Sequence, residues 1–475
     1  MTERLRWLLG LVVAEVTWCS LAVLTNSPYK GLAIPLGLGA AVLICLSPHV
    51  GIYLMASILI GQWPWNLTRN LGLLVVGSAV GWSIIHRRRL YRPNPILHLM
   101  ILYFVLVVLS VVAPVTRVEL LSQVAMYGGQ VALVWLFVNF IDHRQRVWLV
   151  VRLIVLSGVI TAALGLVQAK THFVWIMGTT RYYLETDKQI NADRSAMELQ
   201  GWQGQFRVDS ITGTPDFLPI YMQSIVPIVA FWAYRSRFWQ RMLWLAVIAL
   251  MGVAHILSYT RGVIFTTLLV VLVLGWLIDK RKLLIYGPFA GLAGFMALMS
   301  WPAWRERLLT IVALSANEAP GFVNTGTWRL RTMVVGWQMM WNRPLFGYGV
   351  GQHQWNWPAS TIGDLMPNPK YAQPIPIHNA FLGVGMDLGV GGMLLLIATI
   401  AVAFLQLSRI ARAFDSAGQR DLGDLSRALG VAILGMGASM MLYPMAGTFR
   451  YYPLYLALAA SLWRIEHEGL YHDSR

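Results

Sequence analysis

The sequence predicts an all-α polytopic membrane protein with about 12–14 transmembrane helices and a large helical extracytoplasmic loop near residues 300–379. Of its 475 residues, 57% are hydrophobic and 12% are charged, with a mean hydropathy of +0.58, whereas a soluble domain carries roughly 25% charged residues. Apolar runs recur along the chain, and about 20 apolar residues cross a bilayer as a helix. The net charge of +16 comes from basic residues that lie mostly in short loops between these runs. This placement favours a membrane, and not nucleic acid, as the partner of the charges.

Fourteen apolar runs are candidate spans, and the third and the last are short enough to leave twelve. The first run resembles a signal peptide, but no small-residue cleavage site follows Leu24 and Glu15 interrupts the run. We therefore interpret it as a retained first span. The candidate spans cover residues 7–24, 31–46, 50–61, 71–85, 96–114, 120–141, 147–168, 217–234, 242–258, 262–278, 283–299, 380–407, 428–445 and 451–463.

Basic clusters occupy alternate loops, and this predicts the side of the membrane on which each loop lies. With both termini cytoplasmic, every cluster falls inside, as the positive-inside rule requires. The tight turn at Pro48-His49 is the one loop of that set without a cation. The clusters are Arg4 and Arg6; Arg87, Arg88 and Arg89; Arg144 and Arg146; Arg235, Arg237 and Arg241; Lys280, Arg281 and Lys282; Arg409, Arg412 and Arg420; and Arg464.

The predicted topology divides the chain into five parts. Residues 1–168 form N-terminal transmembrane helices, 169–216 an extracytoplasmic loop, 217–299 further transmembrane helices, 300–379 a large extracytoplasmic loop, and 380–475 the C-terminal transmembrane helices. The longest cytoplasmic loop covers only about 408–427. The outer loops are thus much longer than the cytoplasmic loops, and this difference predicts binding or chemistry on the outer face. No internal repeat is evident, which weakens a transporter built from two related halves.

The outer loop at 300–379 contains six basic and three acidic residues. This excess fits either a solvated surface or a collector for an anionic ligand. Within the loop, Thr327 is predicted to cap a helix that runs to about Trp341. One apolar stripe is expected on that helix, formed by Leu330, Val334, Trp337 and Trp341.

Three arginines are candidates for binding an anion. Arg329 and Arg331 are about 200° apart on the predicted helix, so they cannot both face one ligand, and an arginine in a first helical turn suits a phosphate clamp. Arg261 lies in "SYTRGV", between two apolar runs and on the outer side. A lone arginine there can simply extend to the interface, but the hairpin at Ser258 has almost no loop and would hold this guanidinium at the headgroup plane. We favour a functional role.

A glycine-rich segment, "GYGVGQ" at 347–352, superficially resembles a phosphate-binding loop. No strand precedes it and no helix clearly follows it, so we interpret it as a flexible turn.

A histidine stands where the second outer loop re-enters the membrane. Pro374 and Pro376 keep the approach to His378 extended, Asn379 is a plausible N-cap, and the following helix adds the positive end of its dipole. Asp387 is about half a turn away in azimuth and about 13 Å deeper, so we expect it to pair within the bundle. The arrangement can offer an imidazole as a base beside an anion.

Five segments in this order resemble the O-antigen ligase and polymerase family of polytopic membrane glycosyltransferases. They are "GLVQ" at 165–168, "RVDSITGTPDFLPIYM" at 207–222, "SYTRGVIFTTLLVVLVLG" at 258–275, "WRLRTMVVGWQMMWNRPLFGYGVGQ" at 328–352 and "IHNAFLGVGMDLGVGG" at 377–392. The resemblance covers roughly residues 165–392, and the combination of "NRPLFGYGVGQ" with "HNAFL" is its most specific part.

The resemblance implies a C-type glycosyltransferase that moves a glycan from undecaprenyl diphosphate to an acceptor hydroxyl, with inversion and without a metal or other cofactor. His378 matches the family's catalytic histidine, whereas Arg261, Arg329 and Arg207 match residues for the diphosphate. Gln168, Asn379 and Arg331 are supporting candidates. The chain departs from the family pattern at two residues that bear on the acceptor, Asp216 (often asparagine) and Met333 (often tryptophan).

The implied partners are an undecaprenyl-diphosphate-linked glycan, a lipid or glycan acceptor and membrane lipids, with no nucleic acid. The implied location is the bacterial inner membrane, with both termini cytoplasmic and the active site extracytoplasmic. Ligase and polymerase, which differ in their acceptor, both stay open. So do two other classes: a flippase or exporter of lipid-linked oligosaccharides, and a non-catalytic scaffold for envelope assembly.

Overall fold

The structure, a computed structural model, describes residues 39–58, 65–112, 120–171, 208, 210, 216–312, 325–358, 377–444 and 451–470. These residues form helices and turns, and no strand occurs among them. Residues 39–46 are helical. The other helices are α3 (Pro48–Ile58), α4 (Trp65–Ile85), α5 (Pro95–Ser110), α6 (Leu120–Phe140), α7 (Arg144–Thr171), α9 (Phe217–Arg235), α10 (Phe238–Leu257), α11 (Arg261–Ser300), α12 (Pro302–Val312), α13 (Thr325–Asn342), the short 3₁₀-helix η2 (His353–Trp355), α15 (Ala380–Ser416), α16 (Arg420–Met440) and α18 (Tyr452–His467).

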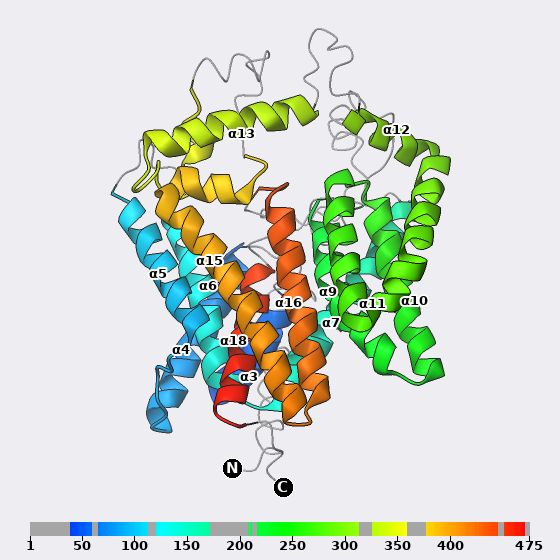
Figure 1. The fold of residues 1–475 in the computed structure, drawn as a ribbon. Coiled ribbons are helices and arrows are strands. Elements are labelled where there is room, and N and C mark those ends of the chain that lie inside the picture. The colour runs from blue at the N-terminus through cyan, green and yellow to red at the C-terminus, as the bar shows by residue number, and fades with distance from the viewer. Residues whose placement is uncertain are drawn as a thin grey trace, which may run out of the picture.

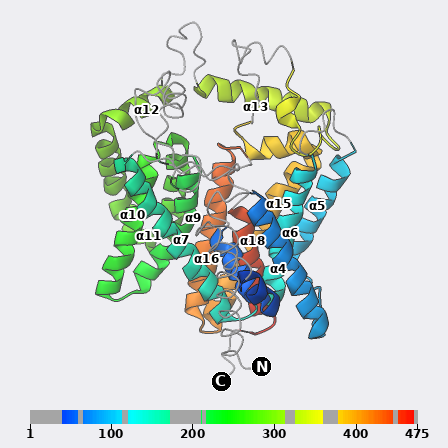
Figure 2. The same ribbon diagram turned by 180° about the vertical axis from the view of Figure 1, so that it is seen from behind.

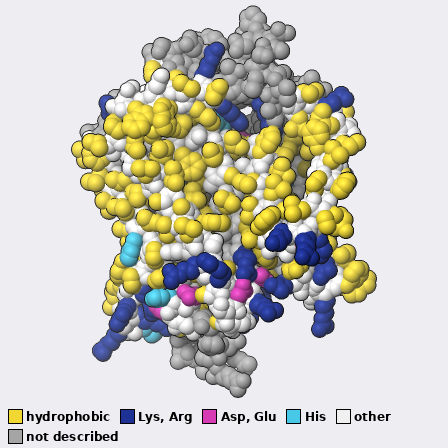
Figure 3. All heavy atoms as spheres, in the orientation of Figure 1, with side chains coloured by type: hydrophobic (Ala, Val, Ile, Leu, Met, Phe, Trp, Pro, Cys, Tyr) yellow, Lys and Arg dark blue, Asp and Glu magenta, His cyan; other side chains and the backbone are white. Residues whose placement is uncertain are grey.

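The predicted fold class is confirmed: the protein is an all-α polytopic membrane protein. Six of the described helices are long and apolar enough to cross a membrane, namely α6, α7, α9, α10, α11 and α15. The helices run roughly side by side, with α12 and α13 across one end, the upper end in Figure 1. A broad apolar band covers the middle of the surface, and basic side chains gather below it (Figure 3).

Two of the long helices are interrupted. α11 contains both predicted spans 262–278 and 283–299, separated by Asp279, whose backbone is not helical (φ −158°, ψ 91°). The Asp279 carboxylate accepts a hydrogen bond from the Lys282 amide at 3.1 Å, so it caps the second half. α15 is broken at Gly389, where φ is +76°. Its first part, 380–388, lies near the upper end, and the remainder descends through the bundle (Figure 1).

Several predicted boundaries were wrong. α13 begins at Thr325, so Thr327 lies inside the helix and is not its cap. The predicted cytoplasmic loop 408–427 is mostly helical, because α15 continues to Ser416 and α16 already begins at Arg420. The turn expected at Pro48-His49 instead lies at Ser47, directly before α3. Polar and charged residues therefore extend the helices beyond the apolar runs from which the spans were predicted.

The lower end is held together by ion pairs between helices that are distant in sequence. Arg464 on α18 is only 3% exposed, and its guanidinium donates to the carbonyl oxygens of Val138 (2.7 Å) and Asn139 (3.1 Å) at the end of α6. Arg464 also pairs with Asp142 at 3.5 Å, and further ion pairs between distant segments include Arg92–Glu468 (2.6 Å), Arg144–Asp421 (2.7 Å) and Arg235–Asp424 (2.6 Å).

The centre of the bundle consists of buried helices that are joined by hydrogen bonds. α18 is buried almost all round, as expected for a helix enclosed by others, and both views show it inside the bundle (Figures 1 and 2). Deep between α9, α11 and α16, Gln223 accepts a hydrogen bond from Thr266 at 2.8 Å, and Thr266 also contacts the Ser439 hydroxyl at 3.0 Å. Hydrogen bonds of this kind hold helices together where lipid offers no competing partner. They fix the helix ends that form the candidate site.

Candidate functional site

The upper hairpin between α10 and α11 positions Arg261. α10 ends at Leu257 and α11 begins at Arg261 itself, which confirms the nearly loop-free hairpin. Tyr259 in the turn has a positive φ of 51°, and its ring stacks on that of Trp304 at 5.6 Å between centroids. Arg261 therefore stands at the first position of a transmembrane helix, where the helix dipole adds further positive potential.

Asp216 connects this hairpin to α9. Asp216 occupies the N-cap position of α9, and its carboxylate accepts a hydrogen bond from the Thr260 hydroxyl at 3.2 Å. Thr260 is in turn the N-cap residue of α11. The hydrogen bond between Asp216 and Thr260 thus joins the starts of α9 and α11, and Thr260 directly precedes Arg261.

Tyr443, just after α16, connects the hairpin to α13. A Cβ atom placed on Gly262 would come within 2.6 Å of the Tyr443 hydroxyl oxygen, so the ring lies directly against this glycine. The Arg329 guanidinium carbon is 5.7 Å from the centroid of the same ring, within the range of a cation–π contact. One aromatic ring therefore joins the segments that carry Arg261 and Arg329.

His378 belongs to the same assembly. It directly precedes Asn379, whose side chain accepts a hydrogen bond from the Leu382 amide at 3.0 Å, which confirms Asn379 as the N-cap of α15. Burial is the main cause that lowers the pKa of His378 from 6.5 to about 4, with a further lowering by the charge of Arg329 and an opposing effect of Asp216. The imidazole is therefore neutral at physiological pH, the state that a general base requires.

The structure thus brings His378, Arg329 and the start of α11 together from three distant segments. Among the described residues of this assembly, two cations stand against one carboxylate and a neutral imidazole, and the resulting positive charge favours an anionic ligand. Arg331 is exposed on α13. Within the described part of the chain, no group of three or more metal-ligating side chains is found.

Gln168 supports the segment that precedes α9. Its buried side-chain oxygen accepts a hydrogen bond from the backbone amide of Ser210 at 2.6 Å, and the Ser210 hydroxyl donates to the Thr161 carbonyl at 2.7 Å. Arg207, the remaining predicted site residue, lies outside the described residues. Gln168 therefore anchors Ser210 to α7.

The glycine-rich segment is neither a phosphate loop nor a free turn. Its amides at Tyr348 and Gly349 donate to the carbonyl oxygens of Met386 (2.8 Å) and Asp387 (3.0 Å), just before the break in α15. Added Cβ atoms would collide with backbone at Gly347 and at Gly389, both of which have positive φ. These amides are therefore used to close a helix break and are not available to a phosphate.

Asp387 completes this contact as the predicted pairing within the bundle. Its carboxylate accepts hydrogen bonds from the His353 amide (3.0 Å) and from the His353 Nδ1 atom (2.9 Å), and both residues are buried. The segment after α13 is thereby fastened to the first part of α15, whose N-cap follows His378.

The fold defines the class of the protein as an all-α polytopic membrane protein, with the hairpin, α13 and the start of α15 meeting at one end. Residues 246–397 match the family model described as O-antigen ligase. The matched segment contains Arg261, Arg329 and His378. A search of the curated proteins found no match to the chain. The match supports a membrane glycosyltransferase of the O-antigen ligase or polymerase type.

Two residues of the assembly were missing from the predicted site. Asp216 lies in the quoted segment "RVDSITGTPDFLPIYM" and was noted only as a departure from the family pattern. Tyr443 had no signal in the sequence, because one tyrosine after an apolar run is common at membrane interfaces. Both lie outside the matched segment 246–397.

Proposed function

We propose that the protein transfers a glycan from undecaprenyl diphosphate to an acceptor hydroxyl at the extracytoplasmic face of the bacterial inner membrane. The observation that carries the proposal is the contact chain from the start of α11 through Tyr443 to Arg329, with Arg329 acting electrostatically on His378. This contact chain brings the candidate base His378 together with Arg261 and Arg329, the two candidate residues for binding phosphate.

In the proposed reaction, the acceptor oxygen attacks the anomeric carbon of the glycan while the bond from that carbon to the diphosphate oxygen breaks. His378 takes the hydroxyl proton, which makes the oxygen a better nucleophile. The undecaprenyl diphosphate leaves as an anion, and Arg261 and Arg329 stabilise its charge through paired N–H donors. An attack opposite to the leaving group gives inversion at the anomeric carbon.

The low pKa of His378 in the free protein suits this sequence of events. A base must be neutral to accept a proton, and burial together with Arg329 keeps it neutral. When an anionic diphosphate binds beside Arg329, its charge favours the imidazolium and makes the imidazole a stronger base. His378 would therefore become a strong base only when the donor is bound.

Product analysis tests the proposal. The purified protein is incubated with a defined undecaprenyl-diphosphate glycan, with and without a lipid A core acceptor, and the products are analysed by mass spectrometry. Transfer to the core identifies a ligase, and elongation of the glycan identifies a polymerase. Recovery of the donor unchanged in both reactions, with an enzyme that binds the donor, contradicts the proposal.

The proposed orientation has its own test. Cysteines introduced at Gln189 and Ala359, in the two predicted outer loops, should react with an impermeant maleimide in spheroplasts. A cysteine introduced at Arg409, in a predicted cytoplasmic cluster, should react only after the membrane is permeabilised. Protection of the first two sites in intact spheroplasts contradicts the orientation and with it the extracytoplasmic site.

A further inference from the structure

A cavity of about 380 Å³ opens at the lower end of the bundle, far from the candidate site. It lies between α9, α10 and the second half of α11, and no step of the proposed reaction uses it. Its walls come from Ala230 and Ala233 on α9 and from Leu245 and Ile248 on α10. The cavity exists because these two positions hold alanine, whereas larger side chains there would fill it.

The lining changes from charged to apolar with depth. Arg241 lies in the first turn of α10, and Leu245 and Ile248 follow it by four and seven residues, which places them about 6 and 10 Å further into the bundle. α9 runs in the opposite direction and ends at Arg235, so Tyr234 lies at the mouth and Ala230 lies about 6 Å deeper. The cavity thus has a polar mouth and an apolar interior.

Two cations stand at the mouth, Arg241 and Lys282. The Arg241 guanidinium donates to the carbonyl oxygens of Ala233 and Ser236, each at 3.2 Å. These contacts hold the side chain in place without neutralising its charge. Lys282 is paired with Asp279 at 3.2 Å but its side chain is 71% exposed. By contrast, Arg235 nearby is bound by the Asp424 carboxylate at 2.6 Å.

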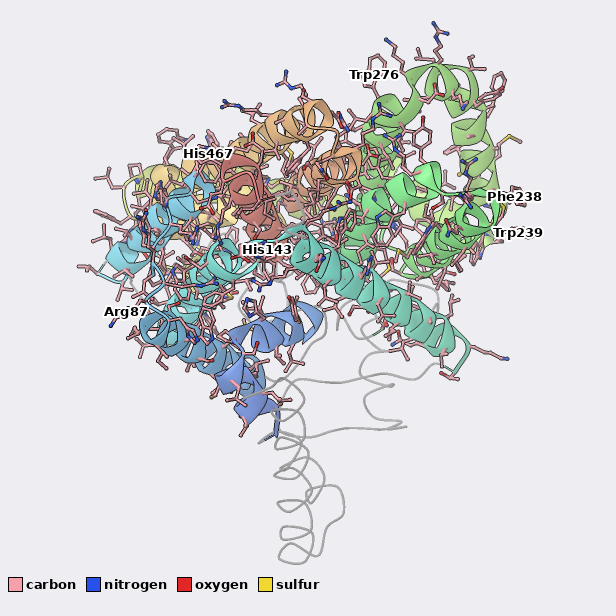
Figure 4. The ribbon with its side chains drawn as sticks, turned by 90° about the horizontal axis from the view of Figure 1, so that it is seen from below. Arg87, His143, Phe238, Trp239, Trp276 and His467 are labelled. Atoms are coloured by element: carbon pink, nitrogen blue, oxygen red, sulfur yellow. The ribbon has the colours of Figure 1, made fainter. Side chains whose placement is uncertain are left out.

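Exposed aromatic residues place this mouth at the level of lipid headgroups. Phe238, Trp239 and Trp276 are 62%, 81% and 56% exposed, and they lie at the outer edge of the bundle when it is seen from below (Figure 4). Aromatic rings are enriched at both membrane–water interfaces. Arg241, three residues after Phe238, is therefore at the depth at which a phospholipid carries its phosphate.

We propose that this cavity binds one anionic phospholipid from the leaflet that contacts the basic loops. Its phosphate ester lies between Arg241 and Lys282, and the first methylene groups of its acyl chains lie against Leu245, Ile248 and Ala230. Charge at the mouth selects an anionic headgroup, since basic pockets between membrane helices favour such lipids. The proposal does not rest on the glycosyltransferase function.

Native mass spectrometry of the full chain in detergent tests the proposal, with palmitoyl-oleoyl phosphatidylglycerol as the probe and the phosphatidylcholine of the same chains for comparison. The wild type should retain one phosphatidylglycerol at a concentration at which it retains no phosphatidylcholine. Replacing both Arg241 and Lys282 with glutamine should lower the affinity roughly tenfold to thirtyfold. Ala230→Leu, which fills the cavity without changing charge, should also lower it. The matched control, Arg409→Gln with Arg412→Gln, removes the same charge from exposed sites at the same end and should retain the wild-type affinity.

Three results would overturn the proposal: equal retention of the two lipids, an equal loss in the matched control, or displacement of phosphatidylglycerol by inorganic phosphate under conditions where sodium chloride of the same ionic strength has no effect. The last result would assign the cavity to free phosphate. Each variant is first checked for a wild-type elution volume and unfolding temperature. If Ala230→Leu fails this check, the glutamine pair and its control decide the outcome.

Discussion

His378→Gln is the sharpest test of the proposed chemistry. Glutamine keeps a polar side chain that can form hydrogen bonds but cannot take a proton. In the free protein the His378 pKa is about 4, so about one imidazole in a thousand is protonated at pH 7. Nearly every molecule therefore starts with a neutral base, and its loss should lower turnover about 10²–10⁴-fold.

Donor binding should change the strength of this base. Burial and Arg329 together disfavour the imidazolium by about 3 kcal/mol, the difference between the ordinary pKa of 6.5 and about 4. An opposite unit charge about 4 Å away contributes about 4 kcal/mol at an effective permittivity of about 20. A bound diphosphate can therefore cancel the lowering and return the pKa of His378 toward the ordinary range.

The pH dependence of the two kinetic constants measures this change. The acid limb of kcat/KM reports the free protein and should fall near pH 4, whereas the acid limb of kcat reports the donor complex and should fall at a higher pH. His378→Gln should abolish the limb of kcat. The control His467→Gln alters an exposed histidine at the opposite end of the molecule (Figure 4) and should leave both profiles unchanged. Near-normal turnover of His378→Gln with an unchanged profile would refute the base, and coincident limbs would refute the electrostatic reasoning.

Three further outcomes are expected. Arg261→Lys or Arg329→Lys should impair turnover and donor affinity although charge is kept, because an ammonium cannot supply paired donors; full turnover with unchanged affinity would contradict the clamp. Tyr443→Ala should weaken donor binding several-fold through loss of the contact with Arg329, worth about 0.5–2 kcal/mol, whereas Tyr443→Phe keeps the ring and should bind nearly as well as the wild type. Gly389→Ala should cost about 1–3 kcal/mol of stability, because φ is +76° and the added methyl group meets the Pro344 carbonyl. The helical control Gly252→Ala has open space around its Cβ and should leave the unfolding temperature in detergent unchanged or slightly higher.

The sequence was sufficient to predict the all-α membrane fold class and several local features of the site. Apolar length determines whether a helix crosses the membrane, and the caps and turns at Asn379 and Arg261 follow from neighbouring residues. The breaks at Asp279 and Gly389 were not predicted as breaks within single helices. At Gly389 the apolar composition continues unchanged across the break, and the backbone groups it frees are bound by residues some forty positions earlier.

Contacts between distant segments explain what the sequence did not reveal about the site. Tyr443 contacts Gly262 and Arg329, which are 181 and 114 positions away in the sequence. No local pattern records such a contact. The exposed apolar stripe of α13 shows the same limit: Leu330, Val334, Trp337 and Trp341 share a face as predicted, but each is 49–65% exposed because α13 packs on α15 through its other face.

The position of Tyr443 and Asp216 outside residues 246–397 affects how this protein can be recombined with its relatives. A chimera that exchanges only the matched segment would import the histidine and both arginines but keep the host's carboxylate and aromatic ring. Its proposed donor site would then combine side chains from two different proteins. Exchange points placed before Asp216 and after Tyr443 would transfer the pocket whole. The segment that forms the proposed site in this protein is therefore longer than the segment that matches the family model.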